Sequence, residues 1–451
     1  MKNQDGSYSY GNFSNGIGIG DSDEGGFHSI VGCDIHTYPG KITGSFALTN
    51  TDSGGIVDNL PTCCATLTNG DTFFASSSGA KIWKCTPAGV VSLVATNGQG
   101  NVLGMGFYGG YLYYACASKL GRIAEANASS EASWSSQNDS WATFSNSDSS
   151  YKPMMKVGSM FLIGDGRYVA GIIAGVFSPN LFDAFTGDRV TAIIPYGSYA
   201  LIGTIISSSV GKSRIHLWDR YSQYPTTSDE DIDESGVNMF FKSGQVVYAQ
   251  IGTVGNLYYW NGSNAIFYKK LRDGDNTVTT GVNPYGAGNL NGLPLINTIR
   301  GVFSLGRSDA NLPIAQVVEY VPSLGQGSTA GALAVVGSQV FVASKNGTSK
   351  VIDKISTNKY SGKFVTPVSY GKLSTLKAYY SSMPTGTSIT AKIKNDDGSF
   401  TSHTLIKDNT SEMCYKSQTK IGNISMVQVE ITLAGSTIYS PTVYDLHILK
   451  N

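Results

Sequence analysis

The sequence predicts an all-β protein in which a β-propeller is followed by a C-terminal β-sandwich and preceded by an extended N-terminal arm. Three observations predict this class. Charged residues make up 14% of the 451 residues, whereas Gly (54) and Tyr (26) are abundant, as expected for short strands joined by tight turns. A hairpin pattern opened by glycine recurs along the chain, and no segment sustains a helical period. The predicted divisions are residues 1–55, 56–364 and 365–451.

Residues 1–55 are predicted to form the arm, which we expect to be partly flexible. Residues 1–26 are rich in Gly, Ser, Asn and Asp and hold few apolar groups. The segment that follows mixes a short apolar stretch with the turn signal Tyr38-Pro39-Gly40. We expect the arm to pack along the propeller or on a neighbouring subunit. Residues 1–26 should become ordered only on such a neighbour, so deleting them should leave the thermal midpoint of the isolated propeller nearly unchanged but impair assembly.

Residues 56–364 are predicted to form the propeller. A turn glycine is followed by an apolar strand, a short polar loop and a second strand, and this unit returns every 36 to 57 residues. Spacings of about 40–50 residues are typical of propeller blades, which bury their faces against neighbours in a ring. Seven such glycines predict about seven blades, with six or eight as alternatives. They are Gly70, Gly109, Gly158, Gly197, Gly244, Gly301 and Gly337.

Residues 365–451 are predicted to form the sandwich, because their strands are longer and alternate more regularly. Val427, Val429, Ile431 and Leu433 fall on one face of a strand whose other face is polar. The segment Asn395-Asp396-Asp397-Gly398 supplies a hairpin turn between two strands. Five to seven strands of this kind favour a β-sandwich.

The sequence contains no motif for catalysis, a metal or a cofactor, so we expect a protein that is not an enzyme and has no such site. The five histidines, His28, His36, His216, His403 and His447, form no HExxH pattern. The groupings Asp34-Ile35-His36 and His216-Leu217-Trp218-Asp219 place polar groups close together on strands, and ordinary strand residues are the simpler interpretation. The six scattered cysteines favour buried, inert thiols over disulfides or zinc.

In the acidic run Asp229–Glu234, the residues Asp229, Asp231 and Asp233 fit positions one, three and five of a calcium-binding loop. Position six should be glycine but is Glu234, and position twelve should be glutamate but is Phe240, so the run is not such a loop. A solvated loop between blades is the favoured interpretation, with a cation site or a channel-facing loop left open. Asp273-Gly274-Asp275-Asn276 is most simply a turn.

Charge and hydropathy limit the partners. Lys and Arg together number 32 and so do Asp and Glu, so a basic nucleic-acid binder held by phosphate contacts is excluded. The first residues lack the apolar core of a signal peptide, and no run of 18 apolar residues predicts a membrane span. The most apolar segment, Val190–Gly211, contains Pro195 and internal glycines and is interpreted as a β-hairpin.

The chain resembles structural proteins of tailed-bacteriophage virions that contain a β-propeller, in particular nozzle or tail-associated proteins. The resemblance lies in the entry segment Ile30–Gly40, in the repeated units, and in the closing segments Lys363–Val368 and Met383–Ile389. It is a resemblance of architecture that covers most of the chain and brings no catalytic residues.

This resemblance implies a virion protein, made in the host cytoplasm, that forms a homo-oligomeric ring in the nozzle or neck of the tail. Its expected partners are neighbouring tail or neck proteins, and DNA would pass through the ring without specific binding during ejection. One alternative is a carbohydrate- or receptor-binding propeller protein of the tail, with exposed aromatic side chains as sugar platforms. A glycan hydrolase is a further alternative.

Overall fold

The structure, a computed structural model, describes residues 7–10, 13–18, 26–38, 40–52, 54–206, 211–228, 231–278, 282–306, 314–381, 383–394, 399–404 and 415–450. Within these residues, regular structure is almost entirely β-strand. The helical segments are short, namely α1 (Glu125–Ala128) and the 3-10 helices η1 (Phe13–Asn15) and η2 (Glu131–Ser136). The prediction of an all-β propeller protein is confirmed.

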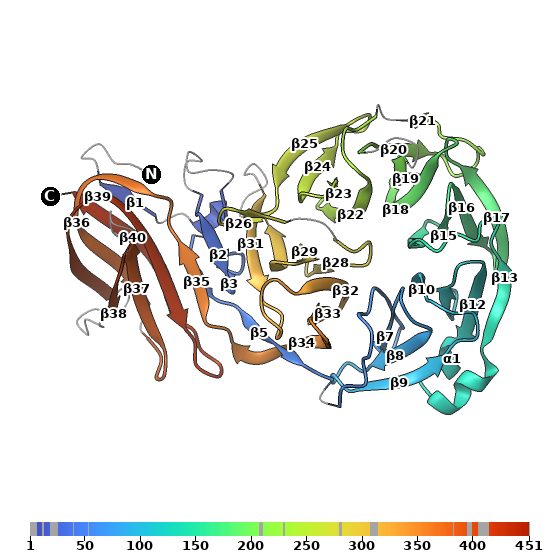
Figure 1. Ribbon diagram of the computed structural model, residues 1–451, viewed down its shortest axis with the longest axis horizontal. Helices are drawn as coiled ribbons and strands as arrows, with labels where there is room; N and C mark the ends of the chain where they lie inside the picture. The colour runs from blue at the N-terminus through green and yellow to red at the C-terminus, as the bar shows by residue number, and fades with distance from the viewer. Residues whose placement is uncertain are drawn as a thin grey trace.

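Four-stranded antiparallel units follow one another around a ring (Figure 1). Unit 1 consists of β6 (Cys63–Thr66), β7 (Thr72–Ala75), β8 (Lys81–Cys85) and β9 (Val91–Thr96). Unit 2 consists of β10 (Gly104–Tyr108), β11 (Tyr111–Ala115), β12 (Lys119–Ala124) and β13 (Asn138–Thr143). Unit 3 consists of β14 (Met154–Val157), β15 (Met160–Asp165), β16 (Tyr168–Ile173) and β17 (Val176–Asp183). Unit 4 consists of β18 (Asp188–Tyr196), β19 (Tyr199–Ile206), β20 (Ser213–Trp218) and β21 (Thr227–Ser228). Unit 5 consists of β22 (Val237–Ser243), β23 (Val246–Ile251), β24 (Asn256–Trp260) and β25 (Ala265–Lys270).

The ring continues through a small hairpin and two further units. The hairpin is β26 (Arg272–Asp273) with β27 (Asn276–Thr277). Unit 6 is β28 (Ala287–Leu290), β29 (Leu293–Thr298), β30 (Gly301–Gly306) and β31 (Ala315–Tyr320), and unit 7 is β32 (Thr329–Val336), β33 (Gln339–Asn346), β34 (Ser349–Lys359) and β5 (Phe46–Asn50). Because each unit is a meander, the turns between first and second strands lie on one face of the ring, here called the hairpin face. The connections between units lie on the opposite, connector face.

Glycine turns mark the repeat, as predicted. All seven glycines singled out from the sequence have positive φ, a conformation that favours glycine. Six of them precede the second strand of a unit, but Gly301 is the first residue of β30, the third strand of its unit. The equivalent turn in unit 6 is Asn291-Gly292, where both residues have positive φ, as in a type I′ hairpin. With Gly292 in place of Gly301, the two irregular spacings of 57 and 36 become 48 and 45.

A strand from the N-terminal segment closes the ring. β5 pairs with β34, and Leu48 lies opposite Ile355. Unit 7 therefore consists of one strand from the N-terminal segment and three strands from residues 329–359. Leu48 is buried in the core between units 6 and 7. This pairing joins the last unit to the segment that leads into unit 1.

One continuous fourteen-stranded sheet links unit 6 to the C-terminal strands. β2 (Ser29–Val31) connects β31 to β35 (Gly362–Val365), which pairs in turn with β39 (Tyr415–Ala434). The other members are β1 (Tyr8–Ser9), β3 (Cys33–Asp34), β4 (Ile42–Gly44), β36 (Ser369–Tyr380), β37 (Ser388–Lys394), β38 (Phe400–Thr404) and β40 (Thr442–Lys450).

This sheet bears on the remaining fold predictions. Because unit 6 is part of a larger sheet, the number of units that act as separate blades stays a prediction. The C-terminal strands belong to the same sheet, so the sandwich also stays a prediction. β35 spans the expected domain boundary between residues 364 and 365, and the predicted turn at residues 395–398 lies outside the described residues.

The described part of residues 1–26 packs against its own chain. β1 pairs with β40, and Phe13 is completely buried. The Phe13 ring stacks on Phe27 at 5.0 Å and meets the edge of Phe364 at 5.4 Å. For these residues, the prediction of order only on a neighbouring subunit is wrong. The apolar side chains of the segment are few, but two of them, Tyr10 and Phe13, are large rings that both contact the buried Phe27.

Candidate functional site

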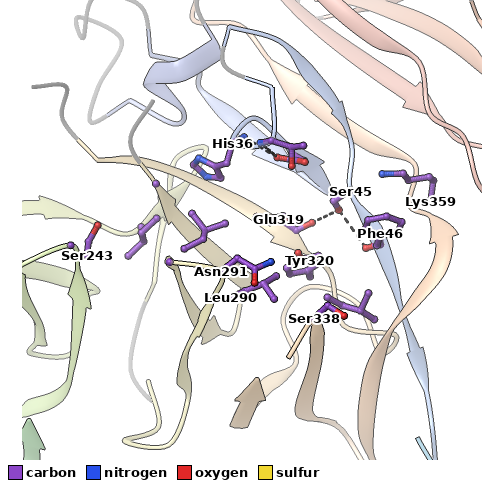
Figure 2. A pocket seen from close by; sticks show the side chains of 18 of the residues that line it. His36, Ser45, Phe46, Ser243, Leu290, Asn291, Glu319, Tyr320, Ser338 and Lys359 are labelled. Atoms are coloured by element: carbon purple, nitrogen blue, oxygen red, sulfur yellow. Dashed lines mark hydrogen bonds between the residues drawn. The ribbon is translucent and has the colours of Figure 1, made fainter. Parts of the chain in front are cut away.

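A large cavity lies on the hairpin face, where the N-terminal segment crosses units 5, 6 and 7. Its volume is about 1110 Å³, slightly above the ~300–1,000 Å³ typical of ligand pockets. Its lining combines apolar side chains such as Leu290 and Phe46 with carboxyl, hydroxyl and amide groups (Figure 2). Asp34 and His36, singled out from the sequence as a pair, both line this cavity.

Glu319 is the central chemical group of the cavity. It lies in β31 at a β-bulge, because Val302 pairs with Tyr320 and Phe303 pairs with Val318, which leaves Glu319 without a partner across the strand. The side chain is 5% exposed, and its Oε2 has no hydrogen-bond partner among the described residues. Burial, helped by the negative charge of Asp34, raises the pKa of Glu319 to about 7.

Hydrogen bonds of Asp34 and Ser304 fix the part of the cavity lining that contains His36. The Asp34 carboxylate accepts hydrogen bonds from the backbone N–H groups of His36 and Thr37, at 2.8 and 3.0 Å. The Nε2 atom of His36 lies 3.1 Å from the Ser304 hydroxyl. Burial lowers the pKa of His36 to about 4, so the imidazole is neutral at pH 7. Glycine at position 306 makes room for the ring, since a Cβ there would collide with Nδ1 of His36.

Lys359 and Phe46 form the side of the cavity nearest the C-terminal strands. The Lys359 ammonium lies 3.8 Å from the centre of the Phe46 ring and donates a hydrogen bond to the Gly44 carbonyl. Burial lowers the pKa of Lys359, although Asp34 and Glu319 oppose this shift. The cavity therefore has a carboxyl group that titrates near neutral pH, a neutral imidazole and an aromatic wall. It can accept a hydrogen bond from an uncharged donor.

Replacing Glu319 with Gln is expected to change the pH dependence of stability. The raised pKa means that the folded state favours the protonated carboxyl, so its stabilising contribution is present below pH 4.5 and is lost as the pH rises through 7. A rise from 4.5 to about 7 corresponds to about 3 kcal/mol. Glu319→Gln should therefore unfold like the wild type below pH 4.5 and be more stable by up to that amount above pH 7.

Urea unfolding of both proteins across this pH range measures the difference. The lowered pKa of His36 acts in the opposite direction, since its contribution is lost as the pH falls from 6.5 through 4. That contribution is common to both proteins and cancels in the comparison. A difference that does not vary with pH would show that Glu319 is not protonated in the folded state at neutral pH.

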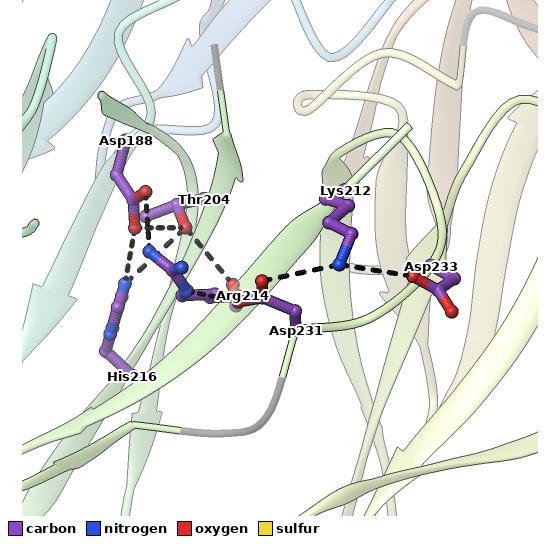
Figure 3. A network of polar contacts seen from close by, with 7 residues as sticks. All are labelled: Asp188, Thr204, Lys212, Arg214, His216, Asp231 and Asp233. Atoms are coloured by element: carbon purple, nitrogen blue, oxygen red, sulfur yellow. Dashed lines mark hydrogen bonds and ion pairs between the residues drawn. The ribbon is translucent and has the colours of Figure 1, made fainter. Parts of the chain in front are cut away.

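A second polar network, around Asp188 in unit 4, is structural (Figure 3). Oδ2 of Asp188 lies 3.1 Å from Nε2 of His216 and accepts a hydrogen bond from Thr204, while Oδ1 is paired with Arg214 at 3.1 Å. The side chains of His216 and Asp188 are completely buried. Thr204 and His216 bond the same carboxylate oxygen, so the group resembles a catalytic triad in composition only.

The acidic run Asp229–Glu234 is largely paired where the structure describes it, from residue 231. Asp231 bonds Arg214 at 2.6 Å, and Lys212 lies 3.6 Å from both Asp231 and Asp233. Arg214 lowers the pKa of Asp231. The described residues contain no group of His, Cys, Asp or Glu that could hold a metal ion. Because neighbouring cations offset this part of the run, it carries less free negative charge than the sequence indicates.

The other residues singled out from the sequence have structural surroundings. Asp273 and Asn276 form the turn-bearing β26–β27 hairpin, as predicted, and Asp273 is paired with Arg300 at 3.0 Å. Burial raises the pKa of the described cysteine thiols, which are free. Of the apolar segment Val190–Gly211, the residues up to Ile206 form part of the β18–β19 hairpin. None of the described helices is long and apolar enough to cross a membrane. Cys414 lies outside the described residues.

Sequence reasoning missed Glu319, the central residue of the cavity. The available signal was one acidic residue inside the apolar strand pattern of residues 314–321. A carboxyl group in such a position is either turned to solvent or held in a special environment.

Comparisons with known proteins yield no family and only distant structural matches. No family model matches the chain, and no curated protein matches it. Similar solved structures include a streptogramin B lyase (10% identity, TM-score 0.49, covering 69% of this chain and 97% of that one). Others are a catalytically inactive virginiamycin B lyase from Staphylococcus aureus with quinupristin (11%, 0.49, 69% and 99%) and YCF48 bound to D1 peptide (9%, 0.45, 69% and 95%).

With identities of 9–11% and TM-scores below 0.5, these likenesses assign no function to the chain. The expectation that the chain is not an enzyme therefore stays a prediction.

Proposed function

We propose that this protein is a structural component of a tailed-phage virion, and that copies associate head to tail into a ring in the tail. The observation that carries the proposal is a strongly exposed aromatic loop. Tyr221 and Tyr224, between β20 and β21, are 85% and 60% exposed. Exposed aromatic groups of this kind are typical of protein interfaces, where tyrosine supplies contact area with a polar tip.

A ring needs two different surfaces on each copy, because head-to-tail interfaces are heterologous. The aromatic loop belongs to unit 4, whereas the cavity around Glu319 lies over units 5 to 7. The loop of one copy would enter the cavity of the next. A tyrosine hydroxyl is a donor, and Oε2 of Glu319 is an acceptor without a partner among the described residues.

Any passage for DNA would have to lie between copies. The middle of each propeller holds two cavities, of about 460 Å³ towards the hairpin face and about 520 Å³ towards the connector face, and Pro284 lines both. The Tyr285 side chain extends across the ring from the connection before unit 6, and its hydroxyl donates to the Lys152 carbonyl and accepts from the Met105 N–H. A sphere of 460 Å³ is about 10 Å across. This is less than the width of the DNA major groove alone, ~12 Å, so the centre of the propeller is too narrow for a duplex.

Light scattering and negative-stain electron microscopy of the purified chain test the proposal. We expect closed rings for the wild type and a shift towards monomers for the double variant Tyr221→Ser/Tyr224→Ser. Tyr439→Ser is the matched control, since Tyr439 is 53% exposed and follows β39, far along the chain from the loop. A wild-type chain that stays monomeric at every soluble concentration would overturn the proposal.

A further inference from the structure

The cavity on the connector face has an unusual lining. It has a volume of about 520 Å³ and is formed by the segments that connect the units and by the starts of the inner strands. Seven of its sixteen lining residues carry a hydroxyl group. Arg189 is the one charged residue among these described lining residues, and none of them is a carboxylate. The cavity is therefore polar and carries a positive charge.

Arg189, at the start of β18, has unused hydrogen-bonding capacity. Its Nη1 donates to the Ser150 hydroxyl at 2.8 Å, and that hydroxyl donates to Asp148 at 2.7 Å. The serine thus stands between the guanidinium and the nearest acid along this chain of bonds. Arg189 forms no ion pair within the described part of the chain, and its buried Nε has no acceptor there. The Nε edge of a guanidinium is suited to bidentate bonding of a carboxylate.

Asn283 supplies a second donor without an acceptor. This side chain is 4% exposed and lines the same cavity. Its Oδ1 accepts a hydrogen bond from the Tyr285 N–H at 2.9 Å, which fixes the orientation of the amide. Its Nδ2 has no partner among the described residues. Buried N–H groups without acceptors are costly, so two of them at one cavity point to a ligand that brings oxygen atoms.

We propose that this cavity binds a small carboxylate that also carries hydroxyl groups, a sugar acid in chemical terms. The carboxylate accepts hydrogen bonds from Arg189 and Asn283, and the ligand hydroxyls exchange hydrogen bonds with the hydroxyl-bearing walls. The volume suits a ligand of this size. The site lies on the face opposite the Glu319 cavity, so it is independent of the proposed ring contact.

Isothermal titration of the full chain with glucuronate tests the proposal, with glucose, acetate and inorganic phosphate as comparison probes. Glucuronate should bind, whereas glucose lacks the charge and acetate lacks the hydroxyls, so each should bind about tenfold or more weakly. Phosphate should also bind more weakly than glucuronate. Failure of glucuronate to bind, or binding of any comparison probe with equal affinity, would overturn the proposal.

Two variants and a control locate the site. Arg189→Met should weaken glucuronate binding by about tenfold or more, because it removes the charged donor. Asn283→Asp keeps the acceptor for the Tyr285 N–H but brings a second carboxylate, so it should also abolish tight binding. Arg167→Met is the control, since Arg167 is paired with Asp183 at 3.0 Å and does not line the cavity. Unchanged binding by folded Asn283→Asp would place the ligand elsewhere.

Discussion

Replacing Lys152 with Met is expected to lower the free energy of unfolding by about 3–5 kcal/mol, the usual cost of breaking a buried ion pair. The Lys152 ammonium lies 2.6 Å from Oδ1 of Asp165, and the two side chains are 1% and 0% exposed. Methionine keeps the apolar stem but leaves the Asp165 carboxylate buried without its cation. The remaining partner of that carboxylate, the Asn146 N–H, offsets only part of the charge.

The pair also supports the centre of the propeller. The Lys152 carbonyl accepts the hydrogen bond from Tyr285, and its N–H donates to the Leu103 carbonyl in the connection before unit 2. A displaced Lys152 would therefore loosen the contact between units 2 and 3 and the side chain that crosses the ring. The loss should be visible as a lower midpoint in urea denaturation.

A surface pair of the same chemistry provides the control. Lys81 and Asp58 lie 2.5 Å apart, but their side chains are 37% and 44% exposed. Lys81→Met should cost at most about 1 kcal/mol, because water screens an exposed pair. In the double variant Lys152→Met/Asp165→Asn, the cost should be smaller than the sum of the two single costs. Equal costs for the buried and exposed pairs would show that burial does not determine the effect.

Local chemistry explains why much of the ring could be predicted from the sequence. A turn that needs positive φ selects glycine, and the apolar strands next to it follow a period of two. The error at Gly301 has the same origin. The run after Gly301 is apolar, whereas Pro294 interrupts the strand after the true turn at Asn291-Gly292. A search for asparagine–glycine pairs would have found that turn.

Long-range contacts explain what could not be predicted. The raised pKa of Glu319 depends on burial beside Asp34, and the two residues are 285 positions apart. The closing strand β5 likewise pairs with β34 across about 300 residues, although its own sequence, FALTN, is not distinctive. Asp34 and His36 were noticed as a local pair, but the cavity they line depends on units 5 to 7.

Replacing Phe13 with Ala is expected to lower the free energy of unfolding of the isolated chain by about 3–5 kcal/mol. Phe13 is completely buried between Phe27 and Phe364, so the shorter side chain leaves a cavity as well as losing apolar contact. Phe364 lies in β35, which belongs to the sheet that joins unit 6 to the C-terminal strands. The effect should therefore reach the global unfolding transition rather than a local one.

Phe400→Ala is the matched control, because Phe400 is 60% exposed and its removal should change stability by no more than about 0.5 kcal/mol. The comparison separates two models of the N-terminal segment. If the segment were ordered only by a neighbouring subunit, Phe13→Ala would leave the monomer's unfolding midpoint unchanged and would affect assembly alone. If Phe13 is part of the core of its own chain, the loss appears in the monomer, at concentrations too low for subunits to associate.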